Sequence, residues 1–365
     1  TGGSVFWSFY ALNGLDELWG QFITLFGHLP SGIVYYGTKI IFITTIILSG
    51  AFIFLKTKSF IKAIIGALAI YIIIFFMGSF PSWVVFLFYL IEGSKEIGEV
   101  TSLDIVQFMA SSYQIFGANG YNIRYAFTTN LNAIYFPVLI FVLGGMFLLS
   151  NTKGALAVVK NARFPQLMYH AGLFLGGMGL GFLAYPQNMH LNLFSILSVL
   201  ILLASIFMAW KASVFFNDIY DVKIDELTNV DRPLQKDVFS EKQYLDLGII
   251  FFSLSLIGGL VVSIKFSLLL LVYQVLAWFY SAPPYRLKRF PVVATLFSSL
   301  ASILVLVMGF NVFSGEDNMA LFPWRIFGLL IVALTLSLPI KDFKDIEGDR
   351  RDGVRTIPVI FGEAV

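Results

Sequence analysis

The chain has 365 residues, of which 58% are hydrophobic and 13% are charged, and its mean hydropathy is +0.83 with a net charge of +2. These values lie far outside the range of soluble globular domains, so the sequence is that of an integral membrane protein. It contains no cysteine, which excludes disulfide bonds, thiol catalysis and thiolate metal sites.

Nine apolar segments approach the roughly 20 residues that a helix needs to cross a hydrocarbon core of about 30 Å. In chain order they are residues 39–56, 61–78, 133–150, 168–186, 190–213, 245–264, 267–282, 291–313 and 322–340. Each run is continuous, whereas a β-barrel needs short strands of alternating polarity. The predicted fold is therefore all-α, a multispanning transmembrane helical bundle.

Residues 1–150 are predicted to form an N-terminal membrane region with about three of these helices and no recognisable chemistry. The apolar run 82–92 within it is too short to span and is expected to lie in the membrane interface or to re-enter. The sequence starts at Thr1, so we expect that the native start is missing. Residues 151–365 form the second predicted part, with about six membrane helices.

Lysine and arginine are distributed unevenly among the loops. If the turn at 56–62 is cytoplasmic, strict alternation of the helices places 153–163, 211–242, 286–289 and 341–355 on the same side. Together with 56–62, these stretches hold 19 of the 24 Lys and Arg residues. The positive-inside rule describes such an excess for cytoplasmic loops.

Two aspartate trios follow membrane helices on this predicted cytoplasmic side. The spacing of three and four residues is the same in both trios, which are Asp218, Asp221 and Asp225, and Asp342, Asp345 and Asp349. On a helix each trio falls within an arc of roughly 60°, so its side chains are expected to converge. Carboxylates are hard oxygen ligands that suit Mg²⁺, so two such faces predict sites for divalent cations.

Three motifs in order resemble those of the UbiA-type intramembrane prenyltransferase superfamily. Asn217–Asp225 is similar to the NDxxDxxxD motif of that family, and Lys341–Arg350 is similar to its second Asp-rich motif. Between them, residues 280–289 (YSAPPYRLKR) resemble the family's Tyr and Lys loop. The resemblance covers roughly residues 155–365.

The resemblance implies a helical bundle with a central cavity, in which both Asp motifs bind Mg²⁺ and the metal holds the diphosphate of an isoprenyl donor. It makes residues 151–365 a prenyltransferase domain. The family usually has nine helices, so its C-terminal helices are expected to be absent from this chain. The first 150 residues have no counterpart in the family pattern.

Further residues are predicted to bind the substrate. The basic residues Arg286, Lys288 and Arg289 are expected either to assist the departing phosphate or to act as topology anchors, and Tyr280 and Tyr285 carry the same ambiguity. Asn217 is expected to orient a metal-bound water or a phosphate oxygen, and Lys341 opens the second motif. Lys211 precedes Asp218 by seven residues, so it either points into the cavity or extends to the membrane interface.

The sequence thus predicts an Mg²⁺-dependent membrane prenyltransferase that transfers an isoprenyl group to an aromatic, ring or polyol acceptor, a lipid precursor, and releases pyrophosphate. The expected partners are a prenyl diphosphate, the acceptor and membrane lipids, without nucleic acid. An alternative with the same site uses polyprenyl phosphate as acceptor for a sugar diphosphate. A divalent-cation transporter is a second alternative, although the trios lie at helix ends rather than in mid-membrane.

Overall fold

The computed structural model describes residues 14–26, 36–110, 123–189, 191–314 and 320–337, together with the single residues 346, 350, 359 and 360. Every regular element within these ranges is a helix. Eight of the described helices are long and apolar enough to cross a membrane. The predicted all-α fold is therefore confirmed, and the protein is a multispanning integral membrane protein.

The eight spanning helices coincide with the first eight predicted segments. They are α2 (Tyr36–Thr57), α3 (Phe60–Glu92), α5 (Ile123–Ser150), α7 (Phe164–Ala184), α8 (Leu193–Tyr220), α10 (Glu241–Val262), α11 (Ile264–Ser281) and α12 (Pro291–Ser314). The ninth segment contains α13 (Trp324–Ser337), an apolar helix of 14 residues. Residues 338–340 of that segment lie outside the described residues.

The prediction of a separate segment at 82–92 was wrong, because α3 continues without a break through Pro81 to Glu92. Proline removes one backbone donor, but membrane helices tolerate this where local adjustments compensate, and polar side chains pair along the same stretch of α3. Ser79 donates to the carbonyl of Phe75 at 2.8 Å, and the Trp83 indole donates to Ser79 at 3.0 Å. The helix ends only at Gly93, whose left-handed backbone (φ 68°) caps it.

The chain divides into two compact units, residues 1–112 with 121–131, and residues 113–120 with 132–365. The described part of the first unit contains α1 (Gly14–Ile23), α2, α3, α4 (Ser102–Met109) and the start of α5. Its core is aromatic, with Phe22 stacked on Tyr71 at 5.1 Å and Phe26 edge-on to Tyr71 at 5.2 Å. The division predicted after residue 150 remains a prediction.

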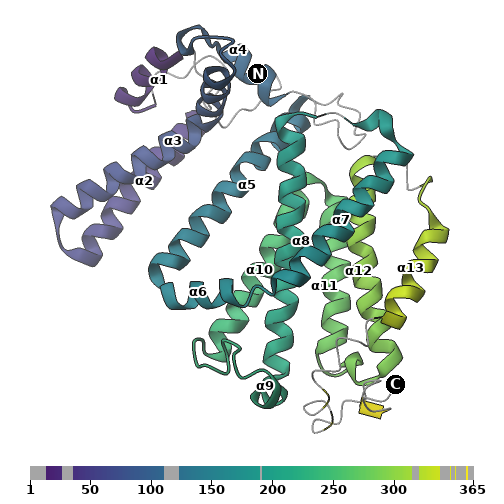
Figure 1. Cartoon of the computed structure of the whole chain (residues 1–365). Coiled ribbons are helices and arrows are strands. Elements are labelled where there is room, and N and C mark those ends of the chain that lie inside the picture. Colours follow the sequence, from purple (N-terminus) through teal and green to yellow (C-terminus); the bar gives the residue numbers. More distant parts are fainter. Residues whose placement is uncertain are drawn as a thin grey trace. The chain divides into compact units, whose positions relative to one another are not determined.

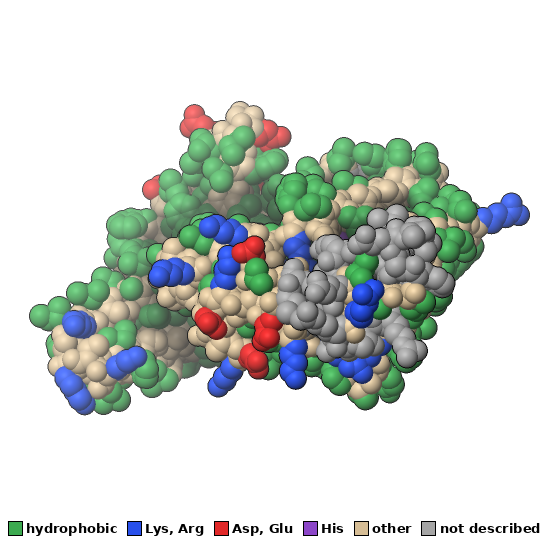
Figure 2. All heavy atoms as spheres, turned by 60° about the horizontal axis from the view of Figure 1, so that its bottom comes forward, with side chains coloured by type: hydrophobic (Ala, Val, Ile, Leu, Met, Phe, Trp, Pro, Cys, Tyr) green, Lys and Arg blue, Asp and Glu red, His purple; other side chains and the backbone are tan. Residues whose placement is uncertain are grey.

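The second unit is a bundle around α8 and α12, the two helices with the largest buried share. Two short helices, α6 (Thr152–Lys160) and α9 (Val222–Thr228), lie at the end of the bundle where α8 terminates (Figure 1). Figure 2 looks toward this end, where charged side chains gather while apolar side chains cover the flanks. This is the distribution expected when the flanks face lipid and the end faces water.

Helices α7 and α12 touch through glycines on both surfaces. A Cβ atom on Gly177 would meet the carbonyl oxygen of Leu306 at 2.0 Å, and one on Gly309 would meet that of Phe174 at 1.9 Å. Gly181 faces Phe310 in the same way, at 2.6 Å. Small residues at such spacing let membrane helices approach until their backbones are in contact, and van der Waals packing then stabilises the pair.

We expect Gly309→Ala to lower the apparent melting temperature of the protein in detergent by several degrees. The added methyl group collides with backbone, which cannot move aside as a flexible side chain can, and overpacking of this kind costs about 1–3 kcal/mol. Gly179→Ala is the matched control, because Gly179 is in α7 with nothing within 4 Å of its Cβ position. Equal melting temperatures for the two variants would contradict the close contact.

Candidate functional site

The first aspartate trio lies where α8 ends and α9 begins. Asp218 is in the last turn of α8, Asp221 is the residue between the two helices, and Asp225 is in α9. Helical hydrogen bonds continue across the junction, since Asp221 N donates to Asn217 O at 3.0 Å and Asp225 N donates to Asp221 O at 2.9 Å. All three residues are buried, with exposed fractions of 1%, 7% and 2%. Buried carboxylates need charged or hydrogen-bonding partners to remain ionised.

Asp218 and Asp225 are held together by one guanidinium group. Arg232 Nη1 donates to Asp218 Oδ1 at 2.9 Å and also to Asp225 Oδ2. Asp218 further accepts from Arg163 Nη2 at 3.2 Å and from the Tyr244 hydroxyl at 3.0 Å. One cationic nitrogen therefore lies within reach of two buried carboxylates.

Asp221 has a different set of partners, from the loop after α11. Its Oδ1 accepts from Arg286 Nη2 at 3.1 Å and from the buried ammonium group of Lys288. Asn217 Nδ2 donates to its Oδ2 at 2.8 Å, and the Asn217 amide oxygen accepts from Ser281 Oγ at 2.9 Å. Asp221 is thus tied to the Tyr and Lys loop region, whereas Asp218 and Asp225 are tied to Arg232.

Burial raises the pKa of Asp225 to about 7, even though the Arg232 guanidinium acts to lower it. Repulsion by the charges of Asp218 and Asp221 raises it further. At Asp225 the positive charge of Arg232 therefore offsets only part of the rise in pKa that burial and the neighbouring carboxylates cause.

The expectation that the three side chains converge holds for Asp218 and Asp225 but not for the trio as one set of ligands. Within the described residues, no group of three or more Asp, Glu or His side chains is placed to hold a metal ion. Asp221 ends α8 with backbone angles of φ −107° and ψ 11°, and its carboxylate pairs with Arg286 and Lys288 rather than with Arg232.

The loop residues are distributed over different environments. Arg286 and Lys288 contact Asp221, while Arg289 is exposed. Tyr285 is 58% exposed and packs edge-on against Phe279, and Tyr280 is half-buried in the last turn of α11. The structure therefore places two of the predicted loop residues, Arg286 and Lys288, beside the carboxylates.

Lys211 is buried within the described part of the bundle. Its Nζ donates to the backbone carbonyl of Asn161 at 2.5 Å and lies 5.1 Å from the centre of the Phe215 ring. It links α8 to the turn between α6 and α7. A role toward substrate remains a prediction.

The second Asp-rich motif has its predicted site residues outside the described part of the chain. These residues are Lys341, Asp342, Asp345 and Asp349.

The sequence interpretation missed four partners of the trio, namely Arg163, Arg232, Tyr244 and Asn229, whose Nδ2 donates to Asp225 Oδ1 at 3.1 Å. Arg232 had a usable signal, because the run Asp231-Arg232-Pro233 follows the first motif much as Arg355 and Pro358 follow the second. Arg163 and Tyr244 had none, since they contact Asp218 across 55 and 26 residues of chain.

Two of the arginines project from left-handed backbone, with φ 49° at Arg163 and φ 42° at Arg286. Residues other than glycine pay roughly 1–2 kcal/mol for this conformation. Each of these arginines forms an ion pair with a buried carboxylate, Asp218 or Asp221. The ion pairs offset the backbone cost at the two points where loops enter the site.

Residues 173–365, slightly more than half of the chain, match the UbiA prenyltransferase family. A digeranylgeranylglyceryl phosphate synthase of Methanosphaera stadtmanae is 29% identical over 158 residues, which cover 43% of this chain and 55% of that protein. A 2-acyl-4-prenylphloroglucinol 6-prenyltransferase of Humulus lupulus is 32% identical over 159 residues, 40% of this chain and 38% of that protein. The chain thus spans about half the length, or less, of these curated relatives.

Among solved structures, a UbiA homolog from Archaeoglobus fulgidus bound to GPP and Mg²⁺ is similar to this chain. The two share 24% identity with a TM-score of 0.47, over 56% of this chain and 69% of that one.

We expect Lys288→Met to destabilise the protein, because it leaves the Asp221 charge buried with one cation fewer. Removal of one partner of a buried ion pair typically costs about 3–5 kcal/mol, so the apparent melting temperature in detergent should fall by several degrees. Arg289→Met is the control, since Arg289 is exposed and should change stability by less than about 0.5 kcal/mol.

A double variant separates lost charge pairing from lost packing. Asp221→Asn in the Lys288→Met background removes the charge that has lost its Lys288 partner, so it should recover part of the lost stability. If the double variant is less stable than Lys288→Met alone, the ion pair is not what Lys288 contributes.

Proposed function

The chain belongs to the UbiA prenyltransferase family, and on that premise we propose that it transfers a prenyl group from a prenyl diphosphate to an acceptor at the membrane. The observation that carries the proposal is the buried pair Asp218 and Asp225 with Arg232 Nη1 between them. A single cation there neutralises two carboxylates at once. Two carboxylates that share one positive charge in this way would also suit a divalent cation.

The donor chemistry of the site fits Mg²⁺. Carboxylate oxygens are its preferred protein ligands, and Mg²⁺ in phosphate-transfer sites is commonly held by one or two carboxylates plus water and substrate phosphate oxygens. A pair of carboxylates is therefore sufficient on the protein side. We propose Asp218 and Asp225 as ligands, with Asp221, Asp342, Asp345 and Asp349 as the remaining acidic residues of the site. When bound, Mg²⁺ neutralises the charge that builds on the leaving diphosphate.

The cationic side chains are suited to bind the donor. Arg163, Arg232, Arg286 and Lys288 each form an ion pair with a carboxylate of the first trio. Cationic groups therefore gather at the described part of the site, which favours an anion. We propose that Arg286 and Lys288 hold diphosphate oxygens by charge-assisted hydrogen bonds.

The reaction needs little from the protein beyond this binding. The bond between C1 of the prenyl group and the diphosphate oxygen breaks, and diphosphate leaves into the cationic end of the bundle. The nucleophilic atom of the acceptor forms the new bond to C1 and loses its proton. The acidic and basic groups orient the leaving group and stabilise its charge, which is the main source of catalysis in such a site.

The direction of α13 supports a place for the second motif at the same site. Phe322, just before α13, packs against Phe310 late in α12, and Thr335 donates to Ser299 early in α12 at 3.1 Å. Helix α13 therefore runs antiparallel to α12, toward the end where Lys288 precedes α12. We propose that both motifs meet there, on the cytoplasmic side given the Lys and Arg distribution.

The acceptor is proposed only as a class. The relatives named above carry glyceryl phosphate and phloroglucinol acceptors in their names. We propose an aromatic, ring or polyol lipid precursor for this chain.

We expect Asp225→Asn to abolish Mg²⁺-dependent transfer, because the amide keeps the size of the side chain but removes a charged ligand. The measurement uses purified protein, radiolabelled prenyl diphosphates and a membrane lipid extract, with Mg²⁺ or with EDTA, and a labelled lipid product as the readout. Loss of at least about 100-fold in rate is the expected result, since removal of one electrostatic contact in a transition state costs this much or more.

Glu226→Gln is the matched control, because Glu226 is the adjacent acid in α9 but is exposed. It should retain the rate of the unchanged protein. Product formation that persists in EDTA, or equal rates for the two variants, would remove the proposed function.

A further inference from the structure

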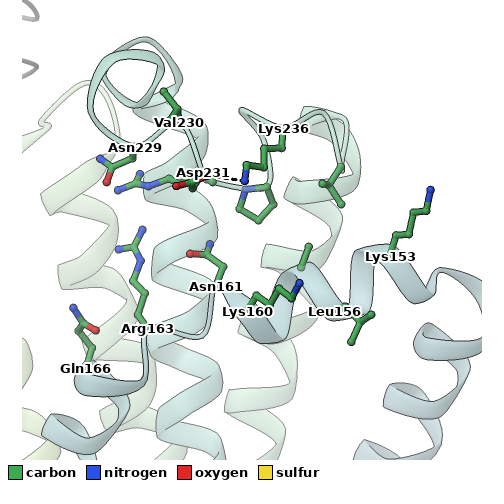
Figure 3. Close-up of a pocket in the computed structure, with 14 residues that line it drawn as sticks. Lys153, Leu156, Lys160, Asn161, Arg163, Gln166, Asn229, Val230, Asp231 and Lys236 are labelled. Atoms are coloured by element: carbon green, nitrogen blue, oxygen red, sulfur yellow. Dashed lines mark ion pairs between the residues drawn. The ribbon is translucent and has the colours of Figure 1, made fainter.

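A second polar site adjoins the carboxylates in the same unit. A cavity of about 820 Å³ opens between α6, the turn that follows it, and the loop after α9. Figure 3 shows Lys153, Lys160 and Arg163 on one wall, and Asn229, Asp231 and Lys236 on the loop opposite. Most of the charged side chains that line it are basic.

Helix α6 is held firmly enough to present its lysines in a fixed position. Ala157 and Val158 pack against the buried cluster of Phe215, Phe239 and Tyr244. Gly154 lies so close to this cluster that an added Cβ atom would meet the Phe239 ring at 2.8 Å.

The two α6 lysines share one face of the helix. Lys153 and Lys160 are seven residues apart, so they lie about 20° from each other around the helix axis and about 10 Å apart along it. This spacing leaves room for a small anionic group between them.

The charges in the cavity do not cancel. Arg163 and Arg232 are paired with Asp218 and Asp225, outside the cavity lining. Lys236 is paired with Asp231, the acid of the lining, at 2.6 Å.

Lys153 and Lys160 have no carboxylate within ion-pair distance in the described part of the chain. Two positive charges therefore remain in the cavity without compensation. A phosphate monoester carries between one and two negative charges at neutral pH, which matches this excess.

Neutral donors are present in the same cavity. Asn161 and Gln166 contribute amide groups to its lining, while the Asn229 amide of the lining donates to Asp225 Oδ1 at 3.1 Å. The buried Nδ2 of Asn161 lies near the Tyr244 hydroxyl but has no acceptor in hydrogen-bonding geometry among the described residues. Amide donors beside lysines are the groups that bind phosphate oxygens in proteins.

We propose that this cavity, which we call the α6 pocket, is a binding site for a phosphate group. Its ligand is a phosphate-bearing compound, either the headgroup of a lipid phosphate monoester or a soluble phosphate. The pocket adjoins the carboxylate cluster, because Arg163, Arg232 and Asn229 of its lining also contact Asp218 or Asp225. Among the described residues, Lys153, Lys160 and Lys236 form no ion pair with the aspartate trio.

The test measures binding rather than transfer, so it does not depend on the proposed function. The full chain is placed in phosphatidylcholine nanodiscs with EDTA, which keeps any divalent cation from the aspartates. One arm measures equilibrium dialysis of radiolabelled inorganic phosphate. The other arm measures binding of short-chain phosphatidic acid, against phosphatidylcholine, to the protein in detergent by native mass spectrometry.

The decisive variant is the double substitution Lys153→Gln and Lys160→Gln, with Lys223→Gln and Lys242→Gln as the matched control. All four lysines are exposed and lie in segments on the same predicted side of the membrane, but Lys223 and Lys242 do not line the pocket. Both doubles therefore lower the net charge equally, and both should keep the melting temperature of the unchanged protein.

We expect saturable binding of one phosphate group per chain, weakened on the order of tenfold or more by the α6 double and retained by the control. Binding in the phosphate arm alone identifies a soluble phosphate, and binding in the lipid arm alone identifies a headgroup. Absence of saturable binding in both arms overturns the proposal. Equal weakening by both doubles also overturns it, because that result reflects general surface charge.

Discussion

Burial of three carboxylates at the end of a membrane helix is the constraint on which the rest of this structure depends. Each buried charge would be unfavourable by several kcal/mol without compensation. The compensating groups come from three separate segments: Arg163 before α7, Arg232 after α9, and Arg286 with Lys288 after α11. The ion pairs therefore join segments at the ends of α7, α9 and α11 to the end of α8.

The same constraint explains why the chemistry lies at the end of α8 rather than in its middle. Upstream of Asp218, α8 is an apolar helix whose buried residues pack against α10 and α11. The one charged side chain of α8 before Asp218 is Lys211, whose Nζ reaches the backbone carbonyl of Asn161 in the turn after α6. The junction with α9 lies beside the polar loops that supply the basic residues. There Asp221 pairs with Lys288, whereas Asp218 and Asp225 share Arg232.

The membrane helices could be predicted from the sequence because lipid imposes a simple rule on length and polarity. Eight predicted segments correspond to described spanning helices, and Arg286 and Lys288 lie beside Asp221. The continuity of α3 was missed, because a proline inside an apolar run does not by itself end a membrane helix. Arg163 and Tyr244 were also missed, because contacts between residues far apart in the chain leave no periodic signal. The split of the trio into a pair and a single carboxylate follows from a backbone break that helix geometry alone does not predict.

The glycine contacts between α7 and α12 have a consequence at the opposite end of these helices. Gly177 lies 14 residues beyond Arg163, a lever arm of about 20 Å, and Gly309 lies 21 residues beyond Lys288, a lever arm of about 30 Å. A change of about 5° in the angle at which the helices cross would displace their starting points by about 2 Å, which exceeds the tolerance of a hydrogen bond. The contact that sets the spacing of the charged groups is thus a patch of backbone in the far half of the bundle, so a larger side chain there would disturb a site that it does not touch.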